Sequence, residues 1–110
     1  MKQAHTAILC TVPTLSVAQN IATTLVTREL AACCNIIQGV ISIYRWQGKV
    51  ETDNEILMII KSTEENYKAI ENSIKELHPY EVPEIISLPI RYGFEKYLKW
   101  INDVTKAGHE

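Results

Sequence analysis

The chain has 110 residues, of which 46% are hydrophobic, and its formal net charge is −2 at pH 7. This length suits a single domain over residues 1–110, and the composition is that of a globular chain, which excludes intrinsic disorder. The near-neutral charge, without a basic run, argues against a nucleic-acid partner. No apolar run approaches the roughly 20 residues of a membrane-spanning helix, so we expect no membrane partner.

The first half of the chain predicts a strand, a helix and the start of a hairpin. Ala4 to Thr11 is apolar and short, as in a buried strand. Residues 18–30 repeat apolar side chains at helical spacing, and Ser16 with Gln19 forms a possible capping box for that helix. Residues 31–46 are rich in β-branched and aromatic side chains, which favours a strand.

The second half predicts the other hairpin strand, two helices and a last strand. Gln47-Gly48 is a turn signal, and residues 50–61 again predict a strand. Ser62 with Glu65 is a second possible capping box, for a helix that Pro79 ends near residue 78. Residues 84–90 predict a last strand, in which Pro89 belongs at an edge or a strand end because it lacks an N–H donor. Residues 94–104 predict a short third helix.

The order strand, helix, strand, strand, helix, strand, with an added C-terminal helix, predicts an α+β fold. This order of elements is the one found in the ferredoxin-like split βαβ arrangement, which has an antiparallel sheet with helices on one face. The hairpin strands are too long for so small a domain, so their far ends should protrude and pair with other copies of the chain in a small symmetric ring. Alternatively, bulges or bends break the hairpin and it packs on its own domain.

The cysteine usage indicates a reducing compartment. Cys10, Cys33 and Cys34 are an odd number, and two of them are adjacent, so they do not form a disulfide framework. The apolar run after residue 6 is too short for a signal-peptide core, so we expect a cytoplasmic protein.

Cys10 and His78 are the candidate metal ligands. In a ferredoxin-like sheet, the end of the first strand and the end of the second helix lie on the same side of the domain. A thiolate with an imidazole there would suit copper and, less selectively, zinc. The alternatives are that Cys10 is a small buried hydrophobic side chain and that His78 caps the second helix.

Other chemistry has less support. Cys10 and His78 lack the third group that would orient a catalytic pair, so we expect no enzyme. Glu81 and Glu84 are either paired carboxylates of a catalytic site or, more often for such residues, solvated or in salt bridges with Lys61 and Arg91. A nucleotide could still bind a cleft between subunits through the three residues Lys61, Arg45 and Tyr80. The four aromatic residues Tyr44, Trp46, Tyr80 and Trp100 either line a pocket or serve packing, and packing is favoured.

Six segments of the chain resemble the CutA divalent-cation tolerance family. They run in the family's order and cover nearly the whole chain, so together they are specific. The segments are Cys10-Thr11-Val12-Pro13, Leu30-Ala31-Ala32-Cys33, Tyr44-Arg45-Trp46-Gln47-Gly48-Lys49, Ile59-Ile60-Lys61-Ser62, His78-Pro79-Tyr80-Glu81-Val82-Pro83-Glu84 and Tyr97-Leu98-Lys99-Trp100.

The resemblance implies a homotrimer of ferredoxin-like subunits and a link to copper and other divalent metal ions. It implies Cys10 as a copper ligand, and His78 as one of a pair of ligand histidines. Leu77 occupies the position of the other histidine, which leaves two donors per subunit. Further donors would come from Glu81, Glu84, water or a neighbouring subunit. A different interpretation is a trimer like the PII signalling proteins, which takes a small molecule between subunits, or a stable trimeric scaffold.

Overall fold

The computed structural model describes residues 4–106, which form four strands and three α-helices. The strands are β1 (His5–Val12), β2 (Cys33–Trp46), β3 (Lys49–Thr63) and β4 (Ile85–Ile90). The α-helices are α1 (Leu15–Thr27), α2 (Tyr67–Leu77) and α3 (Glu95–Val104), and a short 3₁₀ turn, η1 (Glu64–Asn66), precedes α2. These bounds confirm the predicted order of elements.

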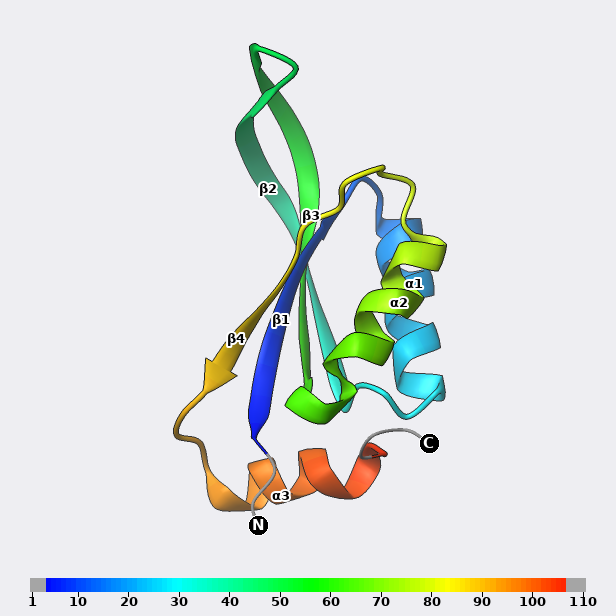
Figure 1. The fold of residues 1–110 in the computed structure, drawn as a ribbon, viewed down its shortest axis with the longest axis vertical. Coiled ribbons are helices and arrows are strands. Elements are labelled where there is room, and N and C mark those ends of the chain that lie inside the picture. The colour runs from blue at the N-terminus through cyan, green and yellow to red at the C-terminus, as the bar shows by residue number, and fades with distance from the viewer. Residues whose placement is uncertain (1–3, 107–110) are drawn as a thin grey trace.

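The four strands form one antiparallel sheet in the order β2-β3-β1-β4. Helices α1 and α2 lie together on one face of this sheet, and α3 lies across its lower end (Figure 1). The predicted α+β, ferredoxin-like arrangement is therefore confirmed. Pro89 lies in β4, an edge strand, where its missing N–H donor is tolerated.

The core lies between the sheet and helices α1 and α2. Alternate residues of β1 and β3 point toward the helices and are buried, as the two-residue period of a strand requires. The helices supply the opposite half of the core from one side of each. The largest contributors are Ile8, Met58, Ile60, Ile21, Leu25, Ile70 and Ile74.

The β2–β3 hairpin extends well past the helices (Figure 1). Gln47 and Gly48 both have positive φ, 50° and 81°, which is the conformation of the two-residue turns that match strand twist. A bulge interrupts the pairing between Ile37 and Val40, where Gly39 also has a positive φ of 83°. The predicted bulge is thus present, but pairing resumes beyond it and the outer half of the hairpin still protrudes.

Both predicted capping boxes are wrong. Helix α1 begins two residues earlier than a Ser16 cap allows, because the Thr14 hydroxyl accepts the Val17 N–H at 3.2 Å. Ser62 is still in β3, and its buried hydroxyl donates to the carbonyl oxygen of Leu30 at 2.5 Å. The chain then enters α2 through η1, which has no side-chain cap.

Candidate functional site

Cys10 and His78 lie close together at the upper end of β1. The His78 Nε2 atom donates a hydrogen bond to the carbonyl oxygen of Thr11 at 2.7 Å, and the Cys10 Sγ atom lies 3.9 Å from the same oxygen. The two predicted ligand side chains therefore converge on one backbone carbonyl group. This juxtaposition follows from the fold, because β1 and α2 end on the same side of the domain.

Both ring nitrogens of His78 are engaged in hydrogen bonds. Nε2 carries the hydrogen that is donated to Thr11, and Nδ1 accepts the backbone N–H of Tyr80 at 3.1 Å. His78 also occupies the C-cap position of α2, where its backbone N–H bonds to the carbonyl oxygen of Ile74. The cap alternative thus holds for its backbone, whereas its buried ring joins β1 to the segment after the helix.

Cys10 is completely buried in the core, among the residues of β1 and β3. Burial, and then the negative charges of Glu84 and Glu55, raise the pKa of its thiol from 9.0 to about 12. At neutral pH the thiol is protonated, whereas a metal ligand must be a thiolate. The donor types therefore fit copper, but both donors must give up protons or hydrogen bonds that they hold in this structure.

No other metal centre is formed within residues 4–106. No three histidine, cysteine, aspartate or glutamate side chains there are grouped so that they could hold an ion. Cys33 and Cys34 are neighbours in β2 and point to opposite sides of the strand: Cys34 packs against the core, while the Cys33 thiol bonds to Asn35. Burial, with Cys33 adding, raises the pKa of Cys34 to about 12.

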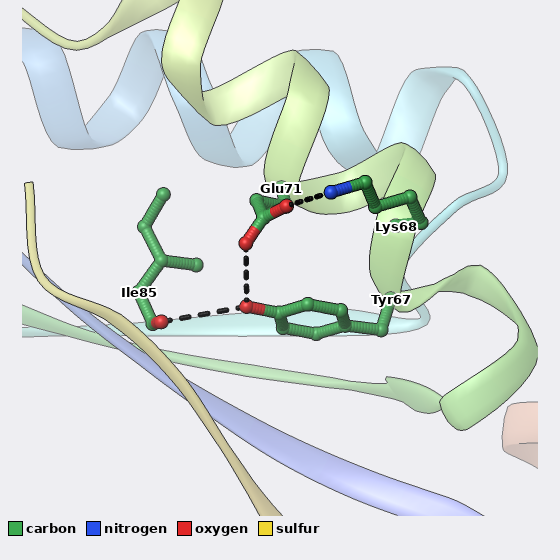
Figure 2. A network of polar contacts seen from close by, with 4 residues as sticks. All are labelled: Tyr67, Lys68, Glu71 and Ile85. Carbon is green, nitrogen blue, oxygen red and sulfur yellow. Dashed lines mark hydrogen bonds and ion pairs between the residues drawn. The ribbon is translucent and has the colours of Figure 1, made fainter.

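The segment that connects α2 to β4, residues 78–84, is anchored at both of its ends. At its start, the His78 ring bonds to β1. At its end, the Tyr67 hydroxyl of α2 lies 3.4 Å from the Ile85 carbonyl oxygen and donates to Glu71 at 3.0 Å (Figure 2). Lys68 binds the other oxygen of Glu71 at 2.7 Å, and these bonds lower the pKa of that carboxyl group. The segment is therefore held in one position over the top of the sheet.

A cleft of about 700 Å³ lies between this anchored segment and the hairpin. Its walls hold three groups of residues: carboxylates, aromatic rings, and small or apolar side chains. The carboxylates are Asp53, Glu55, Glu81 and Glu84; the aromatic rings are Tyr44, Trp46 and Tyr80; the others are Thr11, Ser42, Ile43, Pro79 and Val82. Three of the four aromatic residues considered from the sequence thus line a cleft of the single chain, while Trp100 contacts Tyr97 on α3. Their packing at a contact between subunits stays a prediction.

Two tyrosine–carboxylate pairs line the cleft, one within the hairpin and one that connects the 78–84 segment to the hairpin. The Tyr80 hydroxyl donates to Glu55 at 2.7 Å, and the Tyr44 hydroxyl donates to Asp53. The hydrogen bond to Asp53 raises the pKa of Tyr44 to about 12, and burial with the bond to Glu55 raises the pKa of Tyr80. Both phenols therefore stay protonated and act as donors at neutral pH.

Asp53 and Glu55 did not emerge from the sequence as site residues. They are two apart in β3, so they share a face of the hairpin, and that spacing of carboxylates is the signal that could have identified them. Conversely, Lys61 lies over the Tyr97 ring, and neither Lys61 nor Arg45 lines this cleft. The nucleotide cleft between subunits stays a prediction. Within residues 4–106, Glu81 and Glu84 form no ion pair with Lys61 or Arg91.

The fold and the site define a small α+β protein with a ferredoxin-like sheet, a protruding hairpin and a thiol–imidazole pair at the end of the first strand. Residues 6–104 match the family model of the CutA1 divalent ion tolerance protein, and the chain belongs to this family. Within residues 4–106, no helix is both long and apolar enough to cross a membrane.

Relatives and solved structures agree with this membership. The divalent-cation tolerance protein CutA of Thermus thermophilus is 48% identical over 98 residues, which are 89% of this chain and 95% of that protein. The CutA homolog of Xenopus laevis is 47% identical, and the matched part spans 65% of its length. The structure of the Thermus thermophilus protein superposes with a TM-score of 0.91 at 46% identity, covering 93% of this chain and 99% of that one. A protein from Archaeoglobus fulgidus, described as periplasmic, gives 0.90 at 35% identity and covers 93% and 99%.

Proposed function

We propose that this protein supports tolerance of divalent cations by binding copper or a similar metal ion, without catalysis, through Cys10 and His78. The convergence of both side chains on the Thr11 carbonyl group carries the proposal. Membership of a family described by divalent ion tolerance supports the same class of function. A thiolate and an imidazole are ligands that copper prefers.

Binding at this pair must rearrange the site. His78 cannot ligate through either ring nitrogen without losing its bond to Thr11 or its bond to Tyr80. Because no third such side chain is grouped with this pair within residues 4–106, a further donor would come from Glu81 or Glu84 after rearrangement, from water or from a neighbouring subunit. We therefore expect metal binding to release one anchor of the 78–84 segment.

A calorimetric copper titration of the reduced, oxygen-free full chain tests this proposal. We expect defined stoichiometry in the wild type and a loss of affinity of about tenfold or more in Cys10→Ala and His78→Gln, because removing groups that only orient ligands already has an effect of this size. The matched controls are Cys33→Ala and His5→Gln, which change the same residue types away from the pair. If Cys10→Ala and His78→Gln bind copper as tightly as the controls, the pair is structural.

The proposed assembly is a cytoplasmic homotrimer. It is supported by the protruding hairpin and by exposed apolar side chains on it, of which Ile43 is 69% exposed. Three free cysteines are consistent with a reducing compartment.

A second candidate function is the binding of a small molecule, as in a trimer like the PII signalling proteins. The observation that favours it is the cleft of about 700 Å³, which is of the size that small-molecule sites have. Neither Cys10 nor His78 lines the cleft, although His78 holds the segment that forms one of its walls.

A further inference from the structure

The two ring nitrogens of His78 bond to groups that differ in their access to water. Nε2 donates to the Thr11 carbonyl oxygen at 2.7 Å, and both residues are buried. Nδ1 accepts the backbone N–H of Tyr80 at 3.1 Å, and Tyr80 is 37% exposed in the segment after α2. Separation of a buried pair leaves both groups without partners, whereas the N–H of a partly exposed residue can bond to water instead. The bond to Tyr80 is therefore the one that costs less to break.

The bond to Thr11 is also of the kind that metal-binding histidines make. A ligand histidine almost always donates its other ring N–H to a carboxylate, a backbone carbonyl group or water, and this bond fixes the tautomer and the orientation of the ring. The Nε2–H group of His78 already makes such a bond to Thr11. Nδ1 is then the nitrogen that remains for a metal ion, once the Tyr80 N–H has left it.

A contact to the hairpin holds Tyr80 beside His78. The Tyr80 hydroxyl donates to the buried Glu55 of β3 at 2.7 Å, and the centroids of the Tyr80 and His78 rings are 4.7 Å apart. Pro79 lies between these two aromatic residues and fixes its own φ. This limits how far the Tyr80 N–H can move from Nδ1 while the hydroxyl remains on Glu55. Both partners of the hydroxyl bond belong to one chain, so the bond needs no second copy.

We propose that the Tyr80–Glu55 hydrogen bond is a latch on the metal site, and that breaking it frees Nδ1 of His78 as the ligand nitrogen. In the latched state the Tyr80 N–H occupies Nδ1; in the released state Nδ1 is open while Nε2–H stays on Thr11. Tyr80 is thus a positioning residue, which acts on the metal through His78. The inference rests on the proposed function and deepens it, because it names what regulates the same site.

Hydrogen exchange in the metal-free full chain tests the latch itself. Tyr80→Phe removes the hydroxyl but keeps the ring and the backbone N–H. The amide at position 80 should therefore exchange about tenfold or more faster than in the wild type, the scale of one hydrogen bond to a charged group. Tyr44→Phe is the matched control, because it removes a tyrosine–carboxylate bond, to Asp53, within the same hairpin and should leave that amide unchanged.

The copper titration of the reduced, oxygen-free proteins tests the coupling to the metal site. Tyr80→Phe should bind copper about tenfold or more tightly than the wild type, because a binding-competent state that is more populated raises the apparent affinity. A residue that only supports the site would have the opposite effect on affinity. Tyr44→Phe should bind as the wild type does. Glu55→Gln added to Tyr80→Phe should keep the gain, because the latch is already absent.

The ¹⁵N spectrum of the His78 ring identifies the nitrogen that binds the metal. Copper(I) suits a thiolate ligand and is diamagnetic, so the spectrum can be recorded on the loaded protein. We expect the metal on Nδ1 and the hydrogen on Nε2.

Each contrary outcome overturns a definite part of the inference. Unchanged exchange at position 80 in Tyr80→Phe would mean that the hydroxyl bond is no latch. Faster exchange without tighter copper binding would mean that the latch does not control the site, and copper on Nε2 would mean that the other anchor is released. Loss of the gain on adding Glu55→Gln would make Glu55 a metal ligand. If neither the wild type nor Tyr80→Phe binds copper, the proposed function fails, and the metal-free exchange result distinguishes that failure from the absence of a latch.

Discussion

Single residues at the upper end of the sheet have more than one structural role. Cys10 completes the core, and His78 joins a strand, a helix end and a connecting segment through one ring and one backbone N–H. Both side chains approach the Thr11 carbonyl oxygen, so the two proposed metal ligands lie together. Both are also buried, and each keeps its contacts inside the protein. The same residues therefore support stability in the absence of a ligand and supply the donors for the proposed metal site.

The raised pKa of Cys10 predicts a loss of stability in alkaline solution. The thiol has a pKa of 9.0 in the unfolded chain and about 12 in the fold, so the folded protein retains a proton that the unfolded chain releases. Stability is therefore complete below the unfolded value and falls as pH rises toward the folded value, by about 1.4 kcal/mol per pH unit for this group.

Urea unfolding of the wild type and Cys10→Ala at about pH 8 and about pH 10 measures this effect. The wild type should lose about 1.4 kcal/mol more than the variant between the two conditions. The Cys34 thiol is present in both proteins, so its contribution cancels in the comparison. Equal losses would show that the Cys10 thiol ionises freely inside the fold.

At the scale of elements, the start of each helix depends on where the preceding strand stops. Thr14 follows β1 and the intervening Pro13, and its hydroxyl caps α1. Serine often caps helices, but Ser62 lies within β3, which continues to Thr63. Its hydroxyl instead satisfies the Leu30 carbonyl group and accepts from Asn66 at 3.4 Å.

The observed cap gives a prediction that separates the structure from the sequence pattern. Thr14→Ala should destabilise the protein by about 1 kcal/mol, because the Val17 N–H loses its side-chain acceptor. Ser16→Ala, which removes an exposed hydroxyl two residues after the cap, should change stability by less than about 0.5 kcal/mol. Chemical denaturation of both variants measures the difference; a larger effect at Ser16 would contradict the observed cap.

At the scale of the whole molecule, the sheet face opposite α1 and α2 is covered within residues 4–106 only at its lower end, where α3 contacts it through Lys61 and His5. Paired residues of adjacent strands point to the same face, so Leu9, Ile59 and Ile86 lie together opposite the Cys10 side. Ile86 is 48% exposed, and Ile37 and Leu88 are also among the exposed apolar residues. An apolar sheet face that one copy leaves mostly uncovered supports the proposed association of several copies.

The assembly proposal predicts that a charge on this face separates the subunits. Ile86→Lys should convert the proposed trimer into monomers, because a lysine would be buried without a partner at the contact. Asn20→Lys adds the same charge on the exposed outer side of α1 and should leave the mass unchanged. Light scattering after size-exclusion chromatography gives both masses. A wild type that already runs as a monomer, or an Ile86→Lys protein that stays associated, would contradict the proposal.

Local patterns determined most of the fold. The two-residue period of β1 and β3, the apolar stripes of the helices, the Gln47-Gly48 turn and the stop at Pro79 are properties of short segments, so the order of elements follows from them. The edge position of Pro89 follows from its missing donor. The pairing of Cys10 with His78 at one end of the sheet was also predictable, since the topology fixes which ends meet.

Only the tertiary structure decided what those side chains do once they meet. Whether Ser16 or Thr14 caps a helix depends on the exact end of a strand, and whether His78 is free depends on Thr11 and Tyr80. The cleft brings Glu55 and Tyr80, 25 positions apart, into contact across two segments, and no local pattern contains that contact. Sequence periodicity records which face of an element is buried, whereas the partners of a polar group are set by long-range packing.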